Sequence, residues 1–271
     1  MAFAIIGPLV FTQLEFSQEM EAINTEANSR AASLTRLLTV SEQLMMERVV
    51  ASMRLLKDSS KNQFGKPSLD GTVILGGKEI PSLKLGDQAQ TNHFELVDNL
   101  VAVMGGTATL FVKSGKDFIR VSTNVYKDDG SRAISTLLNP NGKAIAALSL
   151  GKPFYGVVDI LGTPYITGYE PMLDSVGNVI GAWYVGFKID MPALREAVEK
   201  TRILESGFAA VLDANKQIRL LSAHMPASSA AKYLQPTNQD WVQVHKSITE
   251  WNFEVVLAYP ISEARAHSMA R

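Results

Sequence analysis

The sequence predicts an α+β fold in which one long helix precedes two antiparallel sheet units, the second smaller than the first. Residues 13–60 contain no glycine or proline, and their apolar residues recur mostly at steps of three, four or seven, which is a helical period. Strand-like segments with short turns follow at about residues 105–188 and again at 207–260. Strands joined by short hairpins pair antiparallel, so helix and sheet segments that are separated in this way indicate the α+β class.

The long helix is expected over residues 13–63 and ends where Gly65 and Pro67 interrupt the pattern. It is much longer than the usual helix of a globular domain, so it should project as a stalk or pack along a whole domain. Two interpretations stay open. The apolar stripe can form the seam of a homodimer, or it can be the buried face of an ordinary scaffold helix.

The apolar start "MAFAIIGPLVF" carries no charge before Glu15 and is shorter than the roughly 20 apolar residues that span a bilayer. Three interpretations compete: the remnant of a transmembrane helix over residues 1–12, a signal-peptide core without its basic start, or a core segment. We favour the first. No second apolar run occurs near the C-terminus, so a receptor that signals across a membrane would be represented here by a fragment.

The first sheet unit is expected over residues 64–190. A hairpin of residues 107–113 and 117–125 comes first, and "NGKAIAALSLGKP" then predicts a short helix. Three further strands follow in "FYGVVDIL", "PYITGYEPM" and "VIGAWYVGFKI", with a tight turn at Leu161-Gly162-Thr163 between the first two. These five strands predict one antiparallel sheet.

The second unit repeats this order on a smaller scale. Pro192 opens a connecting helix expected over residues 191–204, and a smaller sheet is expected over residues 205–262. Its strands are "GFAAVL", "QIRLLS", "WVQVHKSIT" and "NFEVVLAYP". Residues 263–271 are expected to begin a final helix that leads toward a second transmembrane segment outside this sequence.

Composition and motifs exclude several functions. With 26 Lys and Arg against 27 Asp and Glu, the net charge is −1, which argues against a nucleic-acid partner. The chain has no cysteine, and its four histidines show no metal-ligand spacing, so we predict neither a metal nor a cofactor. Gly76-Gly77-Lys78 reads as a turn rather than a phosphate loop, and no nucleophile elbow occurs. We therefore predict that the chain is not an enzyme.

Strand alternation singles out the candidate binding residues. Tyr165, Thr167 and Tyr169 should share one face of their strand. Arg120 should share a face with Phe118, Ser122 and Asn124, and an arginine inside an apolar strand is costly to bury without an anionic partner. Either these residues lie on a half-exposed sheet, or they form a pocket in which Arg120 holds a carboxylate. Trp183 and Phe187 are expected in the core, and Tyr155 fits either role.

A series of ordered motifs then resembles the Cache superfamily, specifically the Cache 3/Cache 2 fusion type of bacterial chemoreceptors and other transmembrane sensors. The motifs are "RVSTN", "DGSRA", "GKPFYG", "GTPYITGYEP", "DSVGNVIG" and "YVGF", and they cover about residues 105–190. The resemblance implies two PAS-like (Cache) lobes behind a stalk helix. The lobe of residues 64–190 would be membrane-distal and the smaller lobe membrane-proximal.

The resemblance also implies a function. The chain would be the sensing domain of a transmembrane receptor in the bacterial inner membrane, facing the periplasm or the extracellular side. It would bind a small organic ligand, a carboxylate or amino acid by preference, in the distal lobe. Related Cache domains that bind carboxylates use a basic residue of the second strand and polar residues of the fourth, which implies Arg120, Thr167 and Tyr169 as contacts. Together with the residues singled out from the strand faces, the predicted set is Arg120, Ser122, Asn124, Tyr155, Tyr165, Thr167 and Tyr169.

The segment "LLNPNGKAIAALSLGK" departs from the family pattern, which has an aromatic residue before Ala-Ala-Leu, so ligand identity is open. Lys143 in this segment offers a second positive charge, although a solvated lysine is the preferred interpretation. The expected partners are the ligand, a second copy of the chain through the stalk helix, and the membrane through flanking helices. A chemoreceptor is favoured over a histidine kinase or diguanylate cyclase receptor, and over a stand-alone periplasmic binding protein.

Overall fold

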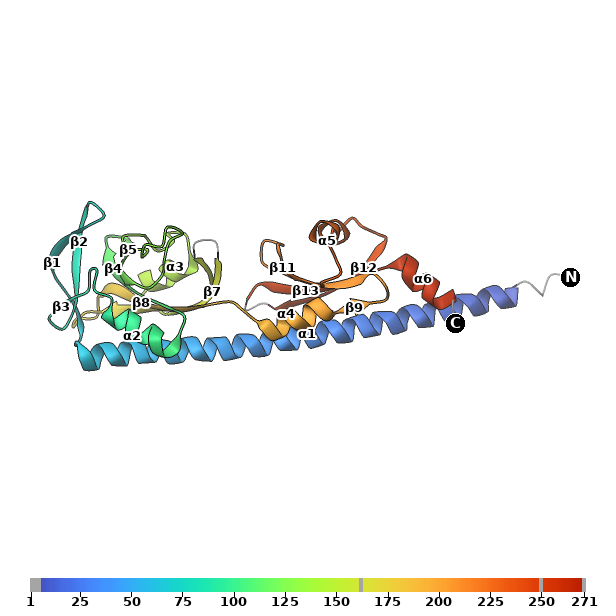
Figure 1. Ribbon diagram of the computed structural model, residues 1–271, viewed down its shortest axis with the longest axis horizontal. Helices are drawn as coiled ribbons and strands as arrows, with labels where there is room; N and C mark the ends of the chain where they lie inside the picture. Colours follow the sequence, from blue (N-terminus) through green and yellow to red (C-terminus); the bar gives the residue numbers. More distant parts are fainter. Residues whose placement is uncertain (1–5, 161–162, 249–250, 270–271) are drawn as a thin grey trace. The chain divides into compact units, whose positions relative to one another are not determined.

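The computed structural model describes residues 6–160, 163–248 and 251–269, and the chain divides into two compact units. The first unit consists of residues 43–190, and the second unit combines residues 1–42 with residues 191–271. Helix α1 (Ile6–Gln63) contributes its beginning to the second unit and its end to the first (Figure 1). Each unit holds its own antiparallel sheet, as the sequence predicted.

Helix α1 confirms the predicted long helix, although it begins at Ile6 rather than at residue 13. Residues 1–5 of the expected membrane remnant lie outside the described residues, as do residues 270–271 of the final helix. The helix ends at Gln63, as expected. The backbone N–H groups of Phe64 and Gly65, just beyond it, both donate to the Ser60 carbonyl. In the described part of the chain, no helix is both long enough and apolar enough to span a bilayer.

The apolar stripe of α1 is mostly buried within each unit. Ile23, Ala27, Ala31, Leu34 and Leu38 are buried in the second unit, whereas Val49, Met53 and Leu56 are buried in the first. The scaffold interpretation of this stripe therefore holds for these positions, since they pack inside the chain's own units.

A small sheet that the sequence did not predict opens the first unit. It consists of β1 (Pro67–Leu75), β2 (Lys78–Leu85) and β3 (Gln88–Ala89), and its first hairpin turns at Gly76-Gly77. The predicted turn at this glycine pair is thus confirmed, and both residues have positive φ. Helix α2 (Glu95–Met104), also not predicted, follows and packs against the main sheet.

The main sheet of the first unit has five antiparallel strands, as the sequence predicted, and their order is β5-β4-β8-β7-β6. The order along the chain is β4 (Thr107–Ser114), β5 (Asp117–Thr123), α3 (Lys143–Ser149), β6 (Phe154–Ile160), β7 (Thr163–Leu173) and β8 (Val179–Lys188). Of the predicted turn between β6 and β7, Leu161 and Gly162 lie outside the described residues.

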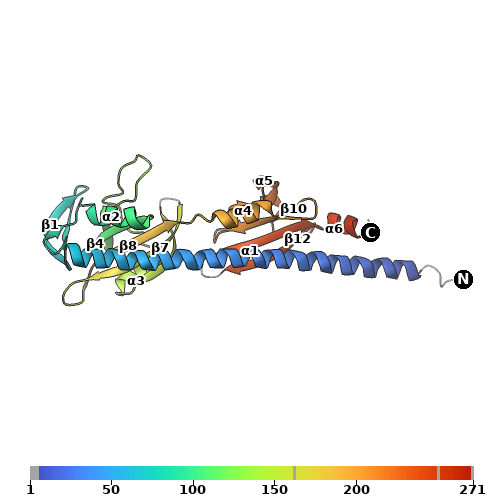
Figure 2. The ribbon, with the colours of Figure 1, turned by 60° about the horizontal axis from the view of Figure 1, so that its bottom comes forward.

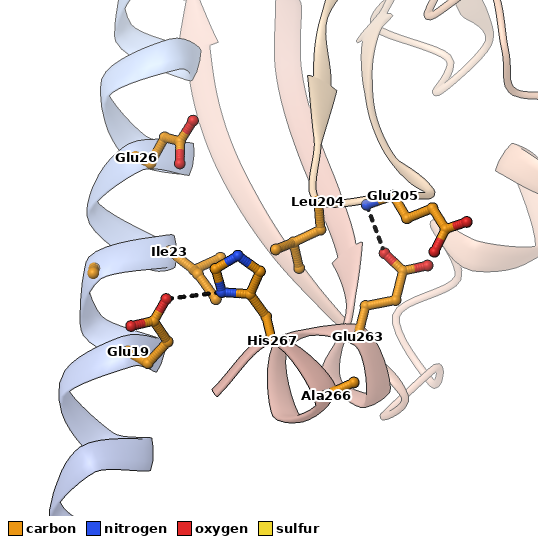
Figure 3. A pocket seen from close by; sticks show the side chains of 9 residues that line it. Glu19, Ile23, Glu26, Leu204, Glu205, Glu263, Ala266 and His267 are labelled. Atoms are coloured by element: carbon orange, nitrogen blue, oxygen red, sulfur yellow. Dashed lines mark hydrogen bonds and ion pairs between the residues drawn. The ribbon is translucent and has the colours of Figure 1, made fainter. Parts of the chain in front are cut away.

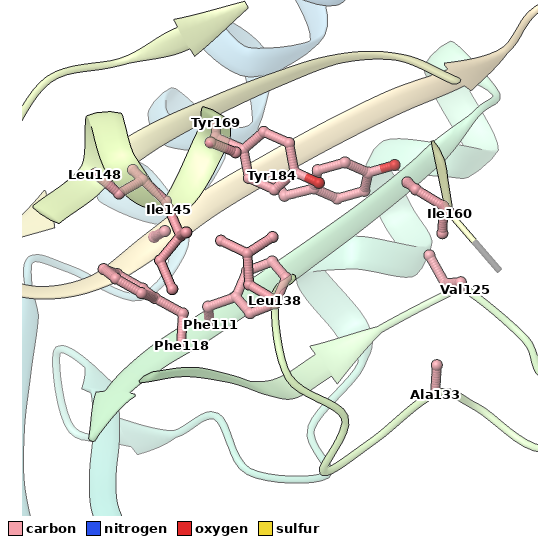
Figure 4. Close-up of a cluster of buried hydrophobic side chains, with 12 residues drawn as sticks. Phe111, Phe118, Val125, Ala133, Leu138, Ile145, Leu148, Ile160, Tyr169 and Tyr184 are labelled. Carbon is pink, nitrogen blue, oxygen red and sulfur yellow. The ribbon is translucent and has the colours of Figure 1, made fainter. Parts of the chain in front are cut away.

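The two faces of this sheet are covered differently. The end of α1 crosses one face beside α2, while α3 and the connection after β5 cover the other (Figures 1 and 2). On the α3 face a cluster of buried side chains includes Phe111, Phe118, Leu138, Tyr169 and Tyr184 (Figure 4). Trp183 and Phe187 are also buried, which confirms their expected place in the core.

The second unit contains a smaller sheet in the order β11-β10-β13-β12, with the short strand β9 beside β10. The connecting helix is shorter than predicted, because α4 ends at Lys200 and the chain turns extended at Thr201. The elements are α4 (Pro192–Lys200), β9 (Arg202–Ile203), β10 (Gly207–Leu212), β11 (Ile218–Leu221), α5 (Ala227–Tyr233), β12 (Trp241–Ile248), β13 (Phe253–Pro260) and α6 (Ile261–Met269).

Candidate ligand-binding site

A cavity of about 340 Å³ lies in the first unit, on the α3 face of the main sheet. Its walls come from β5, the connection after β5, the start of α3, the end of β6 and the middle of β7. The lining residues are Arg120, Leu137, Leu138, Asn139, Gly142, Lys143, Ala144, Val158, Asp159, Ile160 and Tyr169. Such a volume suits a small molecule rather than a macromolecular partner.

A β-bulge places Arg120 in this cavity. Phe111 of β4 pairs with Arg120, but its neighbour Leu110 pairs with Ser122, so Val121 is the extra residue of the bulge. The connection after β5 then returns alongside the strand. The Arg120 backbone N–H donates to the Thr136 carbonyl at 3.0 Å, and the Leu138 N–H donates to the Phe118 carbonyl at 2.9 Å. This return holds the wall of residues 136–138 directly beside the arginine.

The Arg120 guanidinium is buried and only partly satisfied. The residue is 8% exposed, and its Nη1 donates to Thr136 Oγ1 at 2.8 Å and to the Leu137 carbonyl at 3.4 Å. Nε has no partner although it is buried, and among the described residues nothing accepts a hydrogen bond from Nη2. The unsatisfied edge of the fork, Nε with Nη2, has the geometry that a carboxylate binds with two parallel hydrogen bonds.

No carboxylate of the described residues forms an ion pair with Arg120. The ionisable side chains that influence its pKa are those of Tyr169 and Tyr184. Burial lowers the pKa of the guanidinium, but arginine starts so far above neutrality that the group stays charged. The Phe111 ring lies beneath it, with 5.0 Å between Cζ and the ring centroid. A buried cation without an anionic partner costs several kcal/mol, on the order of the desolvation of one ion, and an anionic ligand would offset that cost.

Tyr169 supplies the second polar group of the cavity. Its ring packs against Tyr184 with centroids 4.8 Å apart, and the residue is 1% exposed (Figure 4). Burial raises the pKa of Tyr169, so the hydroxyl is neutral and able to donate. Within the described part of the chain, this hydroxyl has no hydrogen-bond partner, whereas the Tyr184 hydroxyl lies 2.9 Å from Thr107 Oγ1.

The bulge corrects the face predicted for Ser122 and Asn124. Alternation without a bulge would put both beside Arg120, but the extra residue at Val121 turns them to the opposite face. Ser122 Oγ donates to the His93 carbonyl at 2.6 Å, and Asn124 Oδ1 accepts from the Ala108 N–H at 2.6 Å. Neither side chain lines the cavity.

The predicted residues of β6 and β7 other than Tyr169 do not line the cavity either. The Thr167 hydroxyl is buried and donates to the Gly156 carbonyl at 2.8 Å, while Tyr165 packs at the edge of the aromatic cluster. Tyr155 donates from its hydroxyl to Glu170 Oε1 at 2.6 Å. Of the seven predicted residues, the structure therefore brings Arg120 and Tyr169 together at the cavity.

The sequence reasoning missed the apolar wall of the cavity. Val158 and Ile160 alternate along β6 and both pack against the aromatic cluster, a pattern that strand alternation in "FYGVVDIL" could have shown. Thr136 and Leu138 carry no comparable signal, because their segment has no regular secondary structure before it pairs with β5.

The "DGSRA" motif has a structural role in this fold. Arg132 binds Asp98 of α2 with two hydrogen bonds of 2.7 and 2.8 Å, and it also donates to the Thr123 carbonyl at 2.8 Å. Its guanidinium lies over the Phe94 ring. Arg132 is thus satisfied by the protein itself, in contrast to Arg120.

A second cavity, of about 750 Å³, lies in the second unit between α1, α6 and the β9–β10 turn (Figure 3). Its wall is acidic, but three of its carboxylates are engaged. Glu263 accepts from the Glu205 N–H at 3.0 Å, Glu19 Oε1 lies 2.9 Å from His267 Nδ1, and Glu26 pairs with Arg30 at 2.5 Å. None of the unpartnered buried side-chain atoms found in the described residues belongs to this wall. Among the described residues, no three His, Cys, Asp or Glu side chains lie together as metal ligands would, either in this cavity or elsewhere.

The sequence profile of the Cache 3/Cache 2 fusion domain matches residues 15–267. The chain belongs to this family. The resemblance seen in the motifs is therefore confirmed, and the α+β fold with two sheet lobes behind a long helix is that of a Cache sensor. No curated protein sequence matches the chain.

Solved structures share the fold at low identity. The periplasmic domain of RsbU from Chlamydia trachomatis matches over 94% of this chain and 97% of its own, with 12% identity and a TM-score of 0.52. The ligand-binding domain of Mlp24 with asparagine matches over 95% and 98%, with 10% identity and a TM-score of 0.50. The sensory domain of the Campylobacter jejuni chemoreceptor Tlp3 matches over 93% and 99%, with 9% identity and a TM-score of 0.49.

Cache domains are sensory modules that bind small ligands and are not catalytic, and this Cache domain is accordingly a sensory ligand-binding domain. In the cavity of the first unit, the buried Arg120 Nε has no partner, and no described residue hydrogen-bonds to the Tyr169 hydroxyl. They are the groups that a ligand can satisfy.

Proposed function

We propose that this Cache domain is the extracytoplasmic sensing domain of a bacterial transmembrane chemoreceptor, and that it binds a small carboxylate-bearing ligand in the cavity of the first unit. One observation carries the proposal: the buried Arg120 guanidinium lines the cavity, its Nε has no hydrogen-bond partner, and no carboxylate of the described residues pairs with it. A ligand carboxylate would complete both hydrogen bonds and neutralise the charge.

Two relatives support this proposal without deciding it. The ligand-binding domain of Mlp24 is similar in fold and was solved with asparagine, a molecule that carries an α-carboxylate. The RsbU domain of similar fold is periplasmic, which supports an extracytoplasmic location for this chain. A histidine kinase or diguanylate cyclase receptor, or a stand-alone binding protein, would use the same site, and the reading frame around the chain distinguishes these outputs.

The test is a thermal-shift screen of small organic acids, amino acids and amines, because a ligand that binds only the folded state raises the melting temperature. We expect hits among the carboxylates, and we expect Arg120→Ala to abolish them. Arg219→Ala is the matched control, since Arg219 lies on β11 of the other sheet and pairs with Asp213 at 2.6 Å. Hits confined to amines, or carboxylate hits that survive Arg120→Ala, would count against the site.

A route for the signal follows from strand β7. Tyr169 faces the cavity, and the next residue, Glu170, lies on the opposite face, where its Oε2 is 2.6 Å from Lys57 Nζ of α1. We propose that ligand binding at Tyr169 changes the position of β7 and thereby the packing of α1. A receptor also needs a second conformation that the ligand binds with different affinity.

We propose further that α1 forms the homodimer. Leu37, Val40 and Leu44 are 39%, 53% and 62% exposed, and their spacing of three and four puts them on one face of the helix. Val40→Lys with Leu44→Lys is expected to shift a dimer to monomer in sedimentation velocity, whereas the exposed control Gln43→Lys should leave it unchanged. A wild-type chain that stays monomeric at high concentration, with and without a ligand from the screen, would contradict dimerisation through α1.

A further inference from the structure

The charge of the cavity wall narrows the ligand class. Two lining residues are cationic, Arg120 at its buried end and the exposed Lys143 at the start of α3, and a single lining residue, Asp159, is acidic. Val158 and Ile160 both pack against the aromatic cluster, and β6 pairs with β7 without a bulge. The side chain of Asp159, which lies between them, therefore points to the other face of the strand. No carboxylate of the described lining residues faces inward.

This wall suits a carboxylate but not an α-ammonium group. In an α-amino acid both groups are bonded to one carbon, so a partner for the ammonium must lie beside Arg120. The acceptors there lie against the guanidinium itself: Thr136 Oγ1 accepts from Arg120 and donates to the Ala133 carbonyl at 2.6 Å, and the Leu137 carbonyl also accepts from Arg120, so an ammonium bound to either would be repelled by the arginine. An ammonium brought into this space would lose its hydration without an anionic partner.

The Tyr169 hydroxyl also favours a carboxylate over an ammonium group. Its hydroxyl lies in the same cavity as the Arg120 fork and is a neutral group with a hydrogen to donate. A carboxylate oxygen that is not fully satisfied by arginine would accept this hydrogen bond. An ammonium, which only donates, would instead have to share the hydroxyl oxygen beside a guanidinium, and the two cations would repel each other.

Apart from the exposed Asn139, the remaining side chains of the wall are apolar. Leu138 and Ile160 are 6% exposed each, and Ala144 and Val158 complete the surface between them. This surface offers contacts to a short aliphatic chain and no further polar side chain at depth.

We infer that the ligand of this cavity is a short-chain carboxylate without an ammonium group, bound with its carboxylate on Arg120 and Tyr169 and its aliphatic chain between Leu138 and Ile160. This inference rests on the proposed function and deepens it. It separates this site from one that selects amino acids, although the fold is shared with a domain solved with asparagine.

The experiment compares two molecules that differ by the ammonium alone. Butyrate and 2-aminobutyrate are titrated into the whole chain by isothermal titration calorimetry. We expect butyrate to bind at least about 10-fold more tightly, since an unpaired ammonium in an enclosed apolar site costs more than 1.4 kcal/mol, which corresponds to that factor. Equal or tighter binding of 2-aminobutyrate overturns the inference, as does the failure of butyrate to bind.

Three variants make the outcome specific. Arg120→Met should abolish butyrate binding, and Tyr169→Phe should weaken it about three- to tenfold, the loss of one hydrogen bond. Lys143→Met, which removes the exposed cation, should change affinity less than threefold. A loss with Lys143→Met equal to that with Arg120→Met would overturn the assigned position of the carboxylate.

The inference and the proposed function fail in different ways. If 2-aminobutyrate binds in an Arg120-dependent manner while butyrate does not, the inference is wrong and the carboxylate site stands. If no carboxylate of the wider screen binds, or if binding ignores Arg120→Met, the proposed function fails as well. Far-ultraviolet circular dichroism of each variant shows whether it is folded, and Tyr169→Phe keeps the comparison valid should Arg120→Met not fold.

Discussion

The two sheets of this chain share a strand order but differ in what their inner faces hold. The order β5-β4-β8-β7 of the first unit corresponds to β11-β10-β13-β12 of the second, and β6 has no counterpart. The first and second inward-facing residues of β5 are Phe118 and Arg120, whereas those of β11 are Ile218 and Leu221. One position thus carries a cation in one sheet and an aliphatic side chain in the other.

The rest of each inner face follows from this difference. In the second unit the face is filled by apolar side chains, and Tyr233 stacks on Trp241 with centroids 4.2 Å apart. In the first unit the face contains a cavity of about 340 Å³ next to the charge. The inner face of the second sheet is packed with apolar side chains, whereas that of the first keeps a cavity and a buried charge that costs stability. Excess stability given up at one place is a common mark of a functional site.

Exchanging the residue types of Arg120 and Leu221 should have the largest effect on the free energy of unfolding. Leu221→Arg places an unpaired guanidinium on the apolar face of the second sheet, and we expect it to lower the free energy of unfolding by about 2–3 kcal/mol. Arg120→Leu removes a charge that the protein does not pair, so the free energy of unfolding of the ligand-free chain should stay equal or rise. Urea unfolding measures both, with Trp183 as the fluorophore of the first unit and Trp241 and Trp251 as those of the second.

Leu221→Met is the matched control for this exchange, because it conserves volume and should cost less than about 1.5 kcal/mol. If Arg120→Leu destabilised the ligand-free chain as much as Leu221→Arg, the arginine would be a structural element rather than a binding group. The contrast between the two sheets would then be one of packing alone.

Much of this fold could be read from the sequence, because its elements are local. The gap-free helical pattern before Gly65 predicted the long helix, and the hairpin turns between β6 and β8 predicted the antiparallel pairing of these strands, but not the place of β4 beside β8. Strands β1 and β2 were missed because Gly71 and Pro81 interrupt their alternation, and α2 because it is a single short helix without a capping residue.

The site was predictable only in part. Arg120 stood out because a lone cation in an apolar strand needs an explanation, and Tyr169 followed from alternation along β7. Ser122 and Asn124 were placed on the wrong face because one bulge residue, Val121, reverses alternation beyond it, and such a bulge has no sequence signature here. The wall around Leu138 depends on a long-range pairing with β5 that no local pattern reports.

The smallest expected effect concerns one ion-paired glutamate in each unit, Glu170 and Glu254, and we expect it to be similar in the two units. Glu170 accepts from Lys57 and from Tyr155, at 2.6 Å each, and Glu254 accepts from Lys216 at 2.7 Å and contacts His245 at 2.9 Å. Burial raises the pKa of each carboxyl, but the hydrogen bonds and the neighbouring positive charges together lower it more, so both pKa values lie below the ordinary value of 4.5.

A folded-state pKa below the unfolded one stabilises the protein above pH 4.5, and this stabilisation is lost as the pH falls through the folded-state value. We expect Glu170→Gln and Glu254→Gln each to lower the free energy of unfolding at pH 7 by about 0.5–1 kcal/mol, since the pairs are partly solvent-exposed. As the pH falls through the lowered folded-state pKa, each variant should approach the wild type, which urea unfolding at a series of pH values from 7 downward measures. If the deficit of Glu170→Gln did not shrink at any acidic pH of the series, the lysine and tyrosine contacts would stabilise β7 without depending on the charge of Glu170, and the proposed coupling of the cavity to α1 would have to work through packing.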